Sequence, residues 1–120
     1  MQTDLTGMRI LLVEDSPVVG PYTEQLLGDL GCVVVGPAVN MATARELAVS
    51  ASIDAAVMDV HIRGERVFSI CDILEGREIP FLLTSGYAEV ATPEKWRNRP
   101  RLAKPYRLQD VEQALTALLR

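Results

Sequence analysis

The sequence of 120 residues has few of the features that mark a disulfide-bonded, zinc-binding or nucleic-acid-binding protein. Its two cysteines, Cys32 and Cys71, lie far apart in apolar stretches without a C-x-x-C motif, so we expect reduced core thiols in an intracellular protein. Lys and Arg number 12 against 16 Asp and Glu, which gives a formal net charge of −4. No nucleic-acid partner is expected, because such proteins carry a basic face.

Long hydrophobic segments are also missing. The longest apolar runs, such as residues 10–13, are far shorter than the roughly 20 residues that a membrane-spanning helix needs. The N-terminus has neither the basic start nor the apolar core of a secretory signal. We therefore expect a cytoplasmic protein with no membrane partner.

What the sequence does contain is a regular alternation of two apolar patterns. Short continuous runs, typical of parallel strands covered on both faces, occupy residues 8–13, 32–35, 55–58, 79–83 and, more weakly, 101–103. Apolar residues at helical spacing occupy residues 19–30, 41–51, 67–74 and 108–118. The alternation predicts an α/β fold, a doubly wound five-stranded parallel sheet with helices on both faces. We expect one domain over residues 1–120, with a core from about residue 8 and an N-terminal tail at 1–7.

The stretch from residue 86 to residue 100 interrupts this alternation. Pro93 and Pro100 leave little room between them, and proline disfavours helix both at its own position and at the preceding residue. We expect any helix here to be a turn or two long, which makes the fourth helix of the fold an abbreviated one.

Polar side chains stand at the carboxyl ends of four predicted strands. Glu14 and Asp15 follow the first strand, Asp59 follows the third, and Ser85 and Lys104 end the fourth and fifth. Ligands bind at this edge of an open α/β sheet, so we expect these residues to share one site. Neighbouring carboxylates repel one another and need a cation, and an oxygen-only ligand set favours magnesium over zinc. Lys104 would neutralise the remaining charge or hold a phosphoryl group.

The motifs at these strand ends resemble the receiver domain of two-component response regulators. They are residues 10–15 (ILLVED), 57–60 (VMDV), 81–87 (FLLTSGY) and Lys104-Pro105. The resemblance implies a flavodoxin-like receiver fold with strand order 2-1-3-4-5. It also implies that Asp59 accepts a phosphoryl group and that Glu14 and Asp15 hold Mg²⁺ together with it. Ser85 and Lys104 would then bind the acyl phosphate.

The same resemblance assigns roles to two residues beside the acceptor, His61 and Tyr87. The backbone carbonyl of His61 is expected to complete the magnesium shell. The His61 side chain is expected to modulate the lifetime of the phosphorylated form, either by blocking water or by orienting it as a base, while Tyr87 would obstruct in-line attack. The sequence differs from the usual family pattern at Arg101. This residue lies three positions before Lys104, where members of the family commonly carry an aromatic switch residue.

The function implied is that of a single-domain response regulator, similar to a group of stand-alone bacterial receivers with a shortened fourth helix. We expect a histidine kinase or a histidine phosphotransfer protein to supply the phosphoryl group, docking near Val18 and the Pro105-Tyr106 turn. Output would be contact with a downstream protein or removal of phosphate from a phosphorelay. We expect no enzymatic activity beyond self-phosphorylation and self-dephosphorylation.

Two other classes of protein stay open on the residues alone. A phosphatase or phosphotransferase of the Asp-x-Asp class would carry its nucleophile after the first strand and a second Asp two residues later, whereas His61 stands two residues after Asp59. A scaffold of receiver shape that is never phosphorylated would not need the acidic pair or Lys104. A single phosphoryl adduct, turnover of phosphate esters, and no adduct at all would distinguish the three.

Overall fold

A parallel sheet forms the centre of the computed structural model, which describes residues 4–86 and 92–119. Within these residues it has five strands, namely β1 (Arg9–Val13), β2 (Val33–Ala38), β3 (Ala55–Asp59), β6 (Phe81–Ser85) and β7 (Arg101–Ala103). Their spatial order is β2-β1-β3-β6-β7, and all neighbouring strands are parallel. Counted along the chain, this is the order 2-1-3-4-5, so the predicted fold is confirmed.

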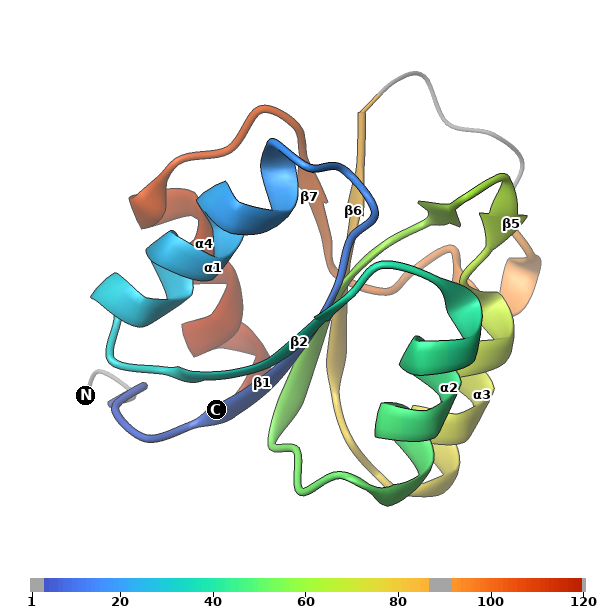
Figure 1. The fold of residues 1–120 in the computed structure, drawn as a ribbon. Coiled ribbons are helices and arrows are strands. Elements are labelled where there is room, and N and C mark those ends of the chain that lie inside the picture. The colour runs from blue at the N-terminus through green and yellow to red at the C-terminus, as the bar shows by residue number, and fades with distance from the viewer. Residues whose placement is uncertain (1–3, 87–91, 120) are drawn as a thin grey trace.

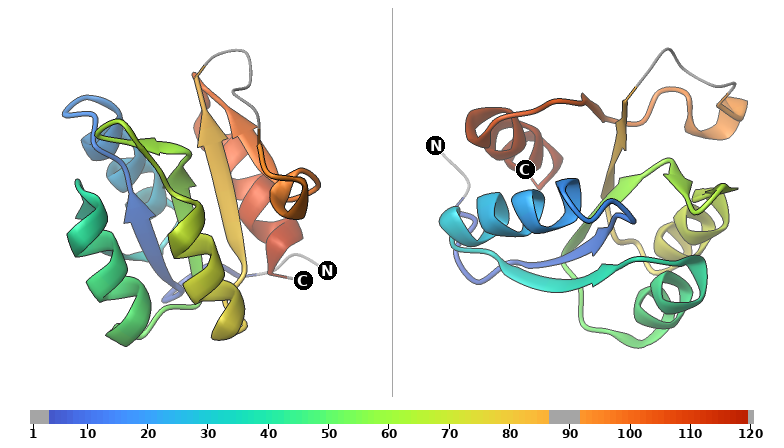
Figure 2. Two further views of the ribbon diagram at one scale, coloured as in Figure 1. Left: turned by 90° about the vertical axis from the view of Figure 1, so that its right-hand side faces the viewer. Right: turned by 45° about the horizontal axis from the view of Figure 1, so that its top comes forward.

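Helices cover both faces of the sheet. The described residues contain α1 (Val19–Asp29), α2 (Met41–Ser50), α3 (Phe68–Gly76) and α4 (Leu108–Leu118). Figures 1 and 2 show α1 and α4 on one face, and α2 and α3 on the other. Leu11 and Val13 of β1 belong to the core under α2 and α3, and Ile10 and Leu12 to the core under α1 and α4. This burial on both sides explains why the strand is continuously apolar. Leu5, ahead of β1, is also buried in the core under α1 and α4.

Side-chain oxygens fix the starts of α1 and α2. The Ser16 hydroxyl accepts hydrogen bonds from the backbone N–H groups of Val18 (3.2 Å) and Val19 (3.0 Å), which turns the chain from the end of β1 into α1. The Asn40 side chain accepts one from the N–H of Thr43 (2.8 Å) at the start of α2. Helix α1 therefore begins at Val19, a short turn after the acidic pair Glu14-Asp15 that follows β1.

A glycine allows β1 and β2 to meet closely where their register shifts. Gly36 has a φ of 107°, a conformation that favours glycine, and a Cβ there would lie 2.8 Å from the carbonyl oxygen of Leu12. Beyond the shift, the N–H of Glu14 donates to the carbonyl of Ala38 at 3.0 Å. This bond holds the backbone of Glu14 at the carboxyl edge of the sheet.

A small antiparallel hairpin follows β3, and the sequence patterns did not predict it. It pairs β4 (His61–Ile62) with β5 (Glu65–Arg66) across the turn residues Arg63 and Gly64. Both turn residues have positive φ, 50° and 80°, as in the type I′ turns of two-residue hairpins. The sequence signal that would have predicted the hairpin is the pair Arg63-Gly64, with glycine at the second position of a two-residue turn between two short strands.

The segment before β7 contains a single turn of 3-10 helix, η1 (Glu94–Trp96), as the flanking prolines predict. Trp96 is buried and packs edge-on against Phe81, with ring centroids 5.5 Å apart. Lys95 and Arg99 form ion pairs with acidic side chains of α3. The buried indole thus packs this segment against β6, and the surface ion pairs connect it to α3.

Two features noted in the sequence have structural counterparts. Cys32 and Cys71 are buried and free, as predicted. Burial raises the pKa of both thiols, that of Cys71 to about 12, so both stay protonated near neutral pH. Among the helices that the structure describes, none is long and apolar enough to cross a membrane.

Candidate functional site

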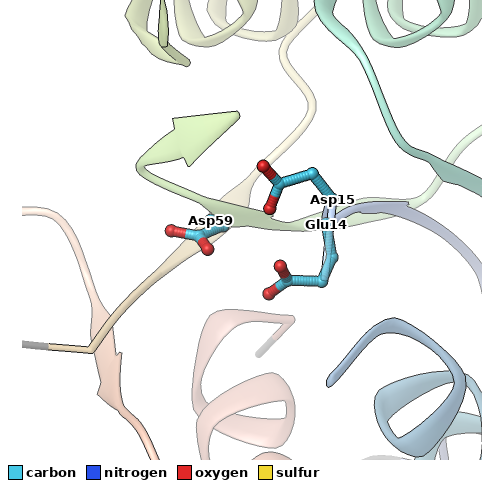
Figure 3. Close-up of side chains that lie close together, drawn as sticks. All are labelled: Glu14, Asp15 and Asp59. Carbon is cyan, nitrogen blue, oxygen red and sulfur yellow. The ribbon is translucent and has the colours of Figure 1, made fainter. Parts of the chain in front are cut away.

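Three carboxylates meet at the carboxyl edge of the sheet. Glu14 and Asp15 directly follow β1, and Asp59 ends β3, the neighbouring strand. One oxygen from each lies within 4.8 Å of the others, and Figure 3 shows the three groups at the corners of a triangle. The structure therefore brings together the three acids that the sequence placed in one site.

Lys104 joins this cluster from the end of β7. Its Nζ lies 2.7 Å from Oε1 of Glu14 and 2.7 Å from Oδ2 of Asp59. Burial of the lysine would lower its pKa, but its hydrogen bonds to the two carboxylates and their charges outweigh burial, so the pKa of Lys104 lies above its ordinary value. Lys104 is therefore a stable cation that bridges two of the three acids.

Glu14 is the most deeply buried of the three acids, with 2% of its surface exposed. Burial raises its pKa above the ordinary value, and the nearby charge of Asp59 adds to this effect. Hydrogen bonds from Lys104 and from the backbone N–H of Ser16, the latter at 3.0 Å, act in the opposite direction without cancelling it. The ionised form of Glu14 thus gains from any further cation placed beside it.

The β4–β5 hairpin supplies backbone donors to the other two acids. The N–H of Arg63 donates to Oδ2 of Asp15 at 2.8 Å, and the N–H of His61 donates to Oδ1 of Asp59 at 3.1 Å. Sequence reasoning missed both contacts because it missed the hairpin. These bonds orient the two carboxylates while leaving lone pairs for a ligand.

Ser85 and His61 also lie at this edge. Ser85 ends β6, where the preceding Thr84 pairs with Asp59, and the Ser85 carbonyl accepts the N–H of Lys104 at 2.9 Å. His61 begins β4 beside the carboxylate of Asp59. The roles of the Ser85 hydroxyl and of the His61 carbonyl and imidazole stay predictions. Tyr87 lies outside the described residues.

A groove of about 460 Å³ opens beside Lys104. Its lining consists of Val19, Tyr22, Gly86, Lys104, Pro105 and Tyr106. Val18, next to the groove in sequence, is 75% exposed, and Pro105 is exposed as well. Although Tyr106 lines the groove, its side chain is buried in the core under α1 and α4 and adds little exposed surface. The exposed apolar surface beside the site is instead formed by Val18, Tyr22 and Pro105.

The donor set at this edge suits a small divalent cation. Carboxylate oxygens are the ligands that Mg²⁺ prefers, and it commonly binds through one or two carboxylates while keeping several waters. The cluster offers one oxygen from each of three acids, all close enough to share one ion. Glu14, Asp15 and Asp59 therefore fit a magnesium site, with Lys104 as a second positive charge on the same carboxylates.

Comparison with solved structures gives close matches over nearly the whole chain. The solution structure of SdrG from Sphingomonas melonis is 35% identical, has a TM-score of 0.84, and the match covers 98% of this chain and 99% of that one. A response regulator receiver protein from Sinorhizobium medicae is 23% identical, with a TM-score of 0.79 and 94% of each chain covered. The receiver domain of sensor histidine kinase PA1611 from Pseudomonas aeruginosa is 24% identical, with a TM-score of 0.76 and coverage of 95% of this chain and 98% of that one. That structure has a magnesium ion coordinated in its active-site cleft. No protein-family model and no curated protein matches the sequence.

Proposed function

The chain belongs to the receiver domains of response regulators, the phosphoacceptor components of two-component signalling, and from this membership we propose that it accepts a phosphoryl group on Asp59 in a magnesium-dependent reaction. The donor is a phosphohistidine of a histidine kinase or a histidine phosphotransfer protein. The observation that carries the proposal is the contact of one ammonium, Lys104 Nζ, with both Asp59 and Glu14 at 2.7 Å, inside a cluster of three acids.

The reaction forms one bond and breaks one. A carboxylate oxygen of Asp59 forms the new P–O bond, the P–N bond of the donor breaks, and the departing imidazole keeps the electron pair and takes up a proton. Asp59 and the phosphoryl group are both negatively charged, so their approach is opposed unless cations lie beside them. Lys104 supplies one such charge at 2.7 Å from Asp59.

Magnesium supplies the second charge when it is bound. Glu14, Asp15 and Asp59 would hold it, together with the backbone carbonyl of His61, and it would neutralise charge shared by the carboxylates and the phosphoryl oxygens. The backbone donors of the β4–β5 hairpin keep Asp15 and Asp59 oriented for this task.

Ser85 and Lys104 act on the product side of the transfer. We propose that the Ser85 hydroxyl donates to an oxygen of the acyl phosphate and that the Lys104 ammonium pairs with another. The hydrogen bond between the Lys104 N–H and the Ser85 carbonyl supports this assignment, because it ties the two strand ends together next to Asp59.

Incubation of the protein with Mg²⁺ and a small phosphodonor, such as acetyl phosphate, tests this function directly. We expect one phosphoryl group per chain by intact mass, with slow loss afterwards. Continuous turnover of phosphate esters would indicate a phosphatase instead, and the absence of any adduct would indicate a scaffold. A cytoplasmic location and a downstream protein target stay predictions.

Removal of Asp15 should weaken magnesium binding. Loss of a residue that only orients a metal ligand typically lowers metal affinity by about 10- to 100-fold. Loss of a ligand itself should cost at least as much, so we expect Asp15→Ala to weaken magnesium binding by at least about tenfold. The measurement is a magnesium titration followed by the NMR shifts of the His61 and Lys104 amides. Asp29→Ala is the matched control, because it removes the same charge from an exposed position at the far end of α1. Equal magnesium affinity in Asp15→Ala and the parent would remove Asp15 from the metal site.

The apolar surface formed by Val18, Tyr22 and Pro105 is the proposed docking site for the phosphohistidine protein. It adjoins Lys104 and is exposed, as the centre of a small transient interface would be before the partner binds. We expect Val18→Asp to slow transfer from a phosphotransfer protein by about tenfold or more, the cost of burying an unpaired charge. Labelling by acetyl phosphate should not change.

Val49→Asp serves as the control for this prediction, since Val49 is an exposed valine on α2, across the sheet from α1. Its rates with both donors should match those of the parent. Equal slowing of Val18→Asp with the protein donor and with acetyl phosphate would mean that Val18 acts on the site itself and does not contact the partner.

A further inference from the structure

We propose that Tyr22 and Thr23, neighbouring residues of α1, are positioning residues for Lys104, because together they hold the turn that carries its ammonium group to Asp59. This inference rests on the proposed function, and it assigns the two α1 residues a part in the same site. They act through Tyr106, which lies two residues after Lys104.

Both ends of Tyr106 are bonded to α1. The Tyr22 hydroxyl donates to the backbone carbonyl of Tyr106 at 2.8 Å, and the Thr23 hydroxyl lies 2.5 Å from the phenolic oxygen of Tyr106. Thr23 and Tyr106 are fully or almost fully buried, at 0% and 4% exposed. A buried hydroxyl that loses its partner is costly, so this pair favours one placement of the Tyr106 ring and backbone.

The bonds to Tyr106 complete a clamp around Lys104. On the side of β7, the N–H of Lys104 donates to the carbonyl of Ser85. On the other side, α1 holds Tyr106, so only Pro105 lies between the two anchored residues, Lys104 and Tyr106. The lysine side chain must reach two carboxylates at 2.7 Å each, and a small displacement of its backbone would lengthen both contacts.

Helix α1 also holds the partner of Lys104 on the opposite side of the site. The N–H of Ser16 donates to the Glu14 carboxylate, and the Ser16 hydroxyl accepts the N–H of Val19, the first residue of α1. One helix is thus bonded at its start to Ser16, two residues after Glu14, and about one turn later to Tyr106, two residues after Lys104.

Two variants remove a hydroxyl and keep the shape of the side chain, Tyr22→Phe and Thr23→Val. We expect each to slow labelling by acetyl phosphate by about three- to tenfold, the scale of one net hydrogen bond. Thr23→Ser, which keeps the hydroxyl, should restore the parental rate. Ser50→Ala is the control, because it removes a hydroxyl that donates to a backbone carbonyl on α2, outside the site; its rate should equal that of the parent.

Two readouts separate positioning of Lys104 from a general loss of stability. In a Lys104→Met background, Tyr22→Phe should cause no further slowing, whereas a structural effect would slow both backgrounds equally. Hydrogen exchange of the Lys104 amide should also be about three- to tenfold faster in Tyr22→Phe and unchanged in Ser50→Ala. Unchanged amide exchange together with a parental labelling rate would overturn the inference. If the parent itself takes up no phosphoryl group, the proposed function fails, and the amide exchange still decides this inference.

Discussion

Replacement of Asp59 by asparagine is expected to abolish uptake of the phosphoryl group from every donor while leaving the fold in place. The amide has no anionic oxygen to form the P–O bond, so labelling should fall below detection. The amide oxygen can still accept the hydrogen bond from Lys104, and loss of the charge relieves the repulsion that helps to raise the pKa of Glu14. We therefore expect the free energy of unfolding to equal or exceed that of the parent.

The measurement is intact mass after incubation with acetyl phosphate and Mg²⁺, with urea unfolding of the same sample. Asp72→Asn is the matched control, because Asp72 is an exposed acid on α3 whose ion pair lies outside the cluster. It should label at the parental rate. Full labelling of Asp59→Asn would place the acceptor elsewhere.

Replacement of Lys104 by methionine should have the second-largest effect on transfer. Removal of a charged or hydrogen-bonding group that stabilises developing charge costs about 100- to 1000-fold in rate, and Lys104 is the ammonium at 2.7 Å from the acceptor. The rate of labelling by acetyl phosphate measures this loss. A rate within about twofold of the parent, far short of that loss, would remove Lys104 from the reaction.

The same variant should change the pH dependence of stability. Without Lys104, the pKa of the buried Glu14 rises further, because the hydrogen bond that lowered it is gone. A carboxyl whose folded pKa exceeds its unfolded value of about 4.3 favours folding below that value and loses this contribution as pH rises through the folded pKa. Lys104→Met should thus be less stable than the parent by about 1–3 kcal/mol at neutral pH, and the difference should shrink in acid.

Urea unfolding of the parent and the variant across the acidic to neutral range measures this difference. Lys95→Met is the control, since Lys95 forms exposed ion pairs with α3 that contribute little to stability. A destabilisation of Lys104→Met that is the same at every pH would mean that lost packing, and not the Glu14 charge, explains it.

Sequence patterns predicted the sheet and the central cluster because both follow from local rules. Continuous apolar runs are typical of strands buried on both faces, and β1 contributes to a core on each side of the sheet. Parallel strands place their carboxyl ends on one edge, which is why Glu14, Asp15 and Asp59 could be assigned to one site before their distances were known.

Strand limits and long-range contacts were harder to predict. The second strand was expected to end at residue 35, yet β2 continues through Pro37, which is tolerated because β2 is an edge strand. The bonds of Tyr22 and Thr23 to Tyr106 join residues 84 and 83 positions apart, and no periodicity reports such contacts. Arg63 reaches Asp15 only because a two-residue turn returns the chain to the site.

The most direct test of the account is to locate the phosphoryl group. After incubation with Mg²⁺ and acetyl phosphate, the protein is treated with borohydride, which reduces an aspartyl phosphate to homoserine, and is then digested and sequenced by mass spectrometry. We expect homoserine at residue 59, no conversion in the Asp59→Asn variant, and none when EDTA replaces Mg²⁺. Conversion at a different residue, or equal conversion at residue 59 without magnesium, would contradict it.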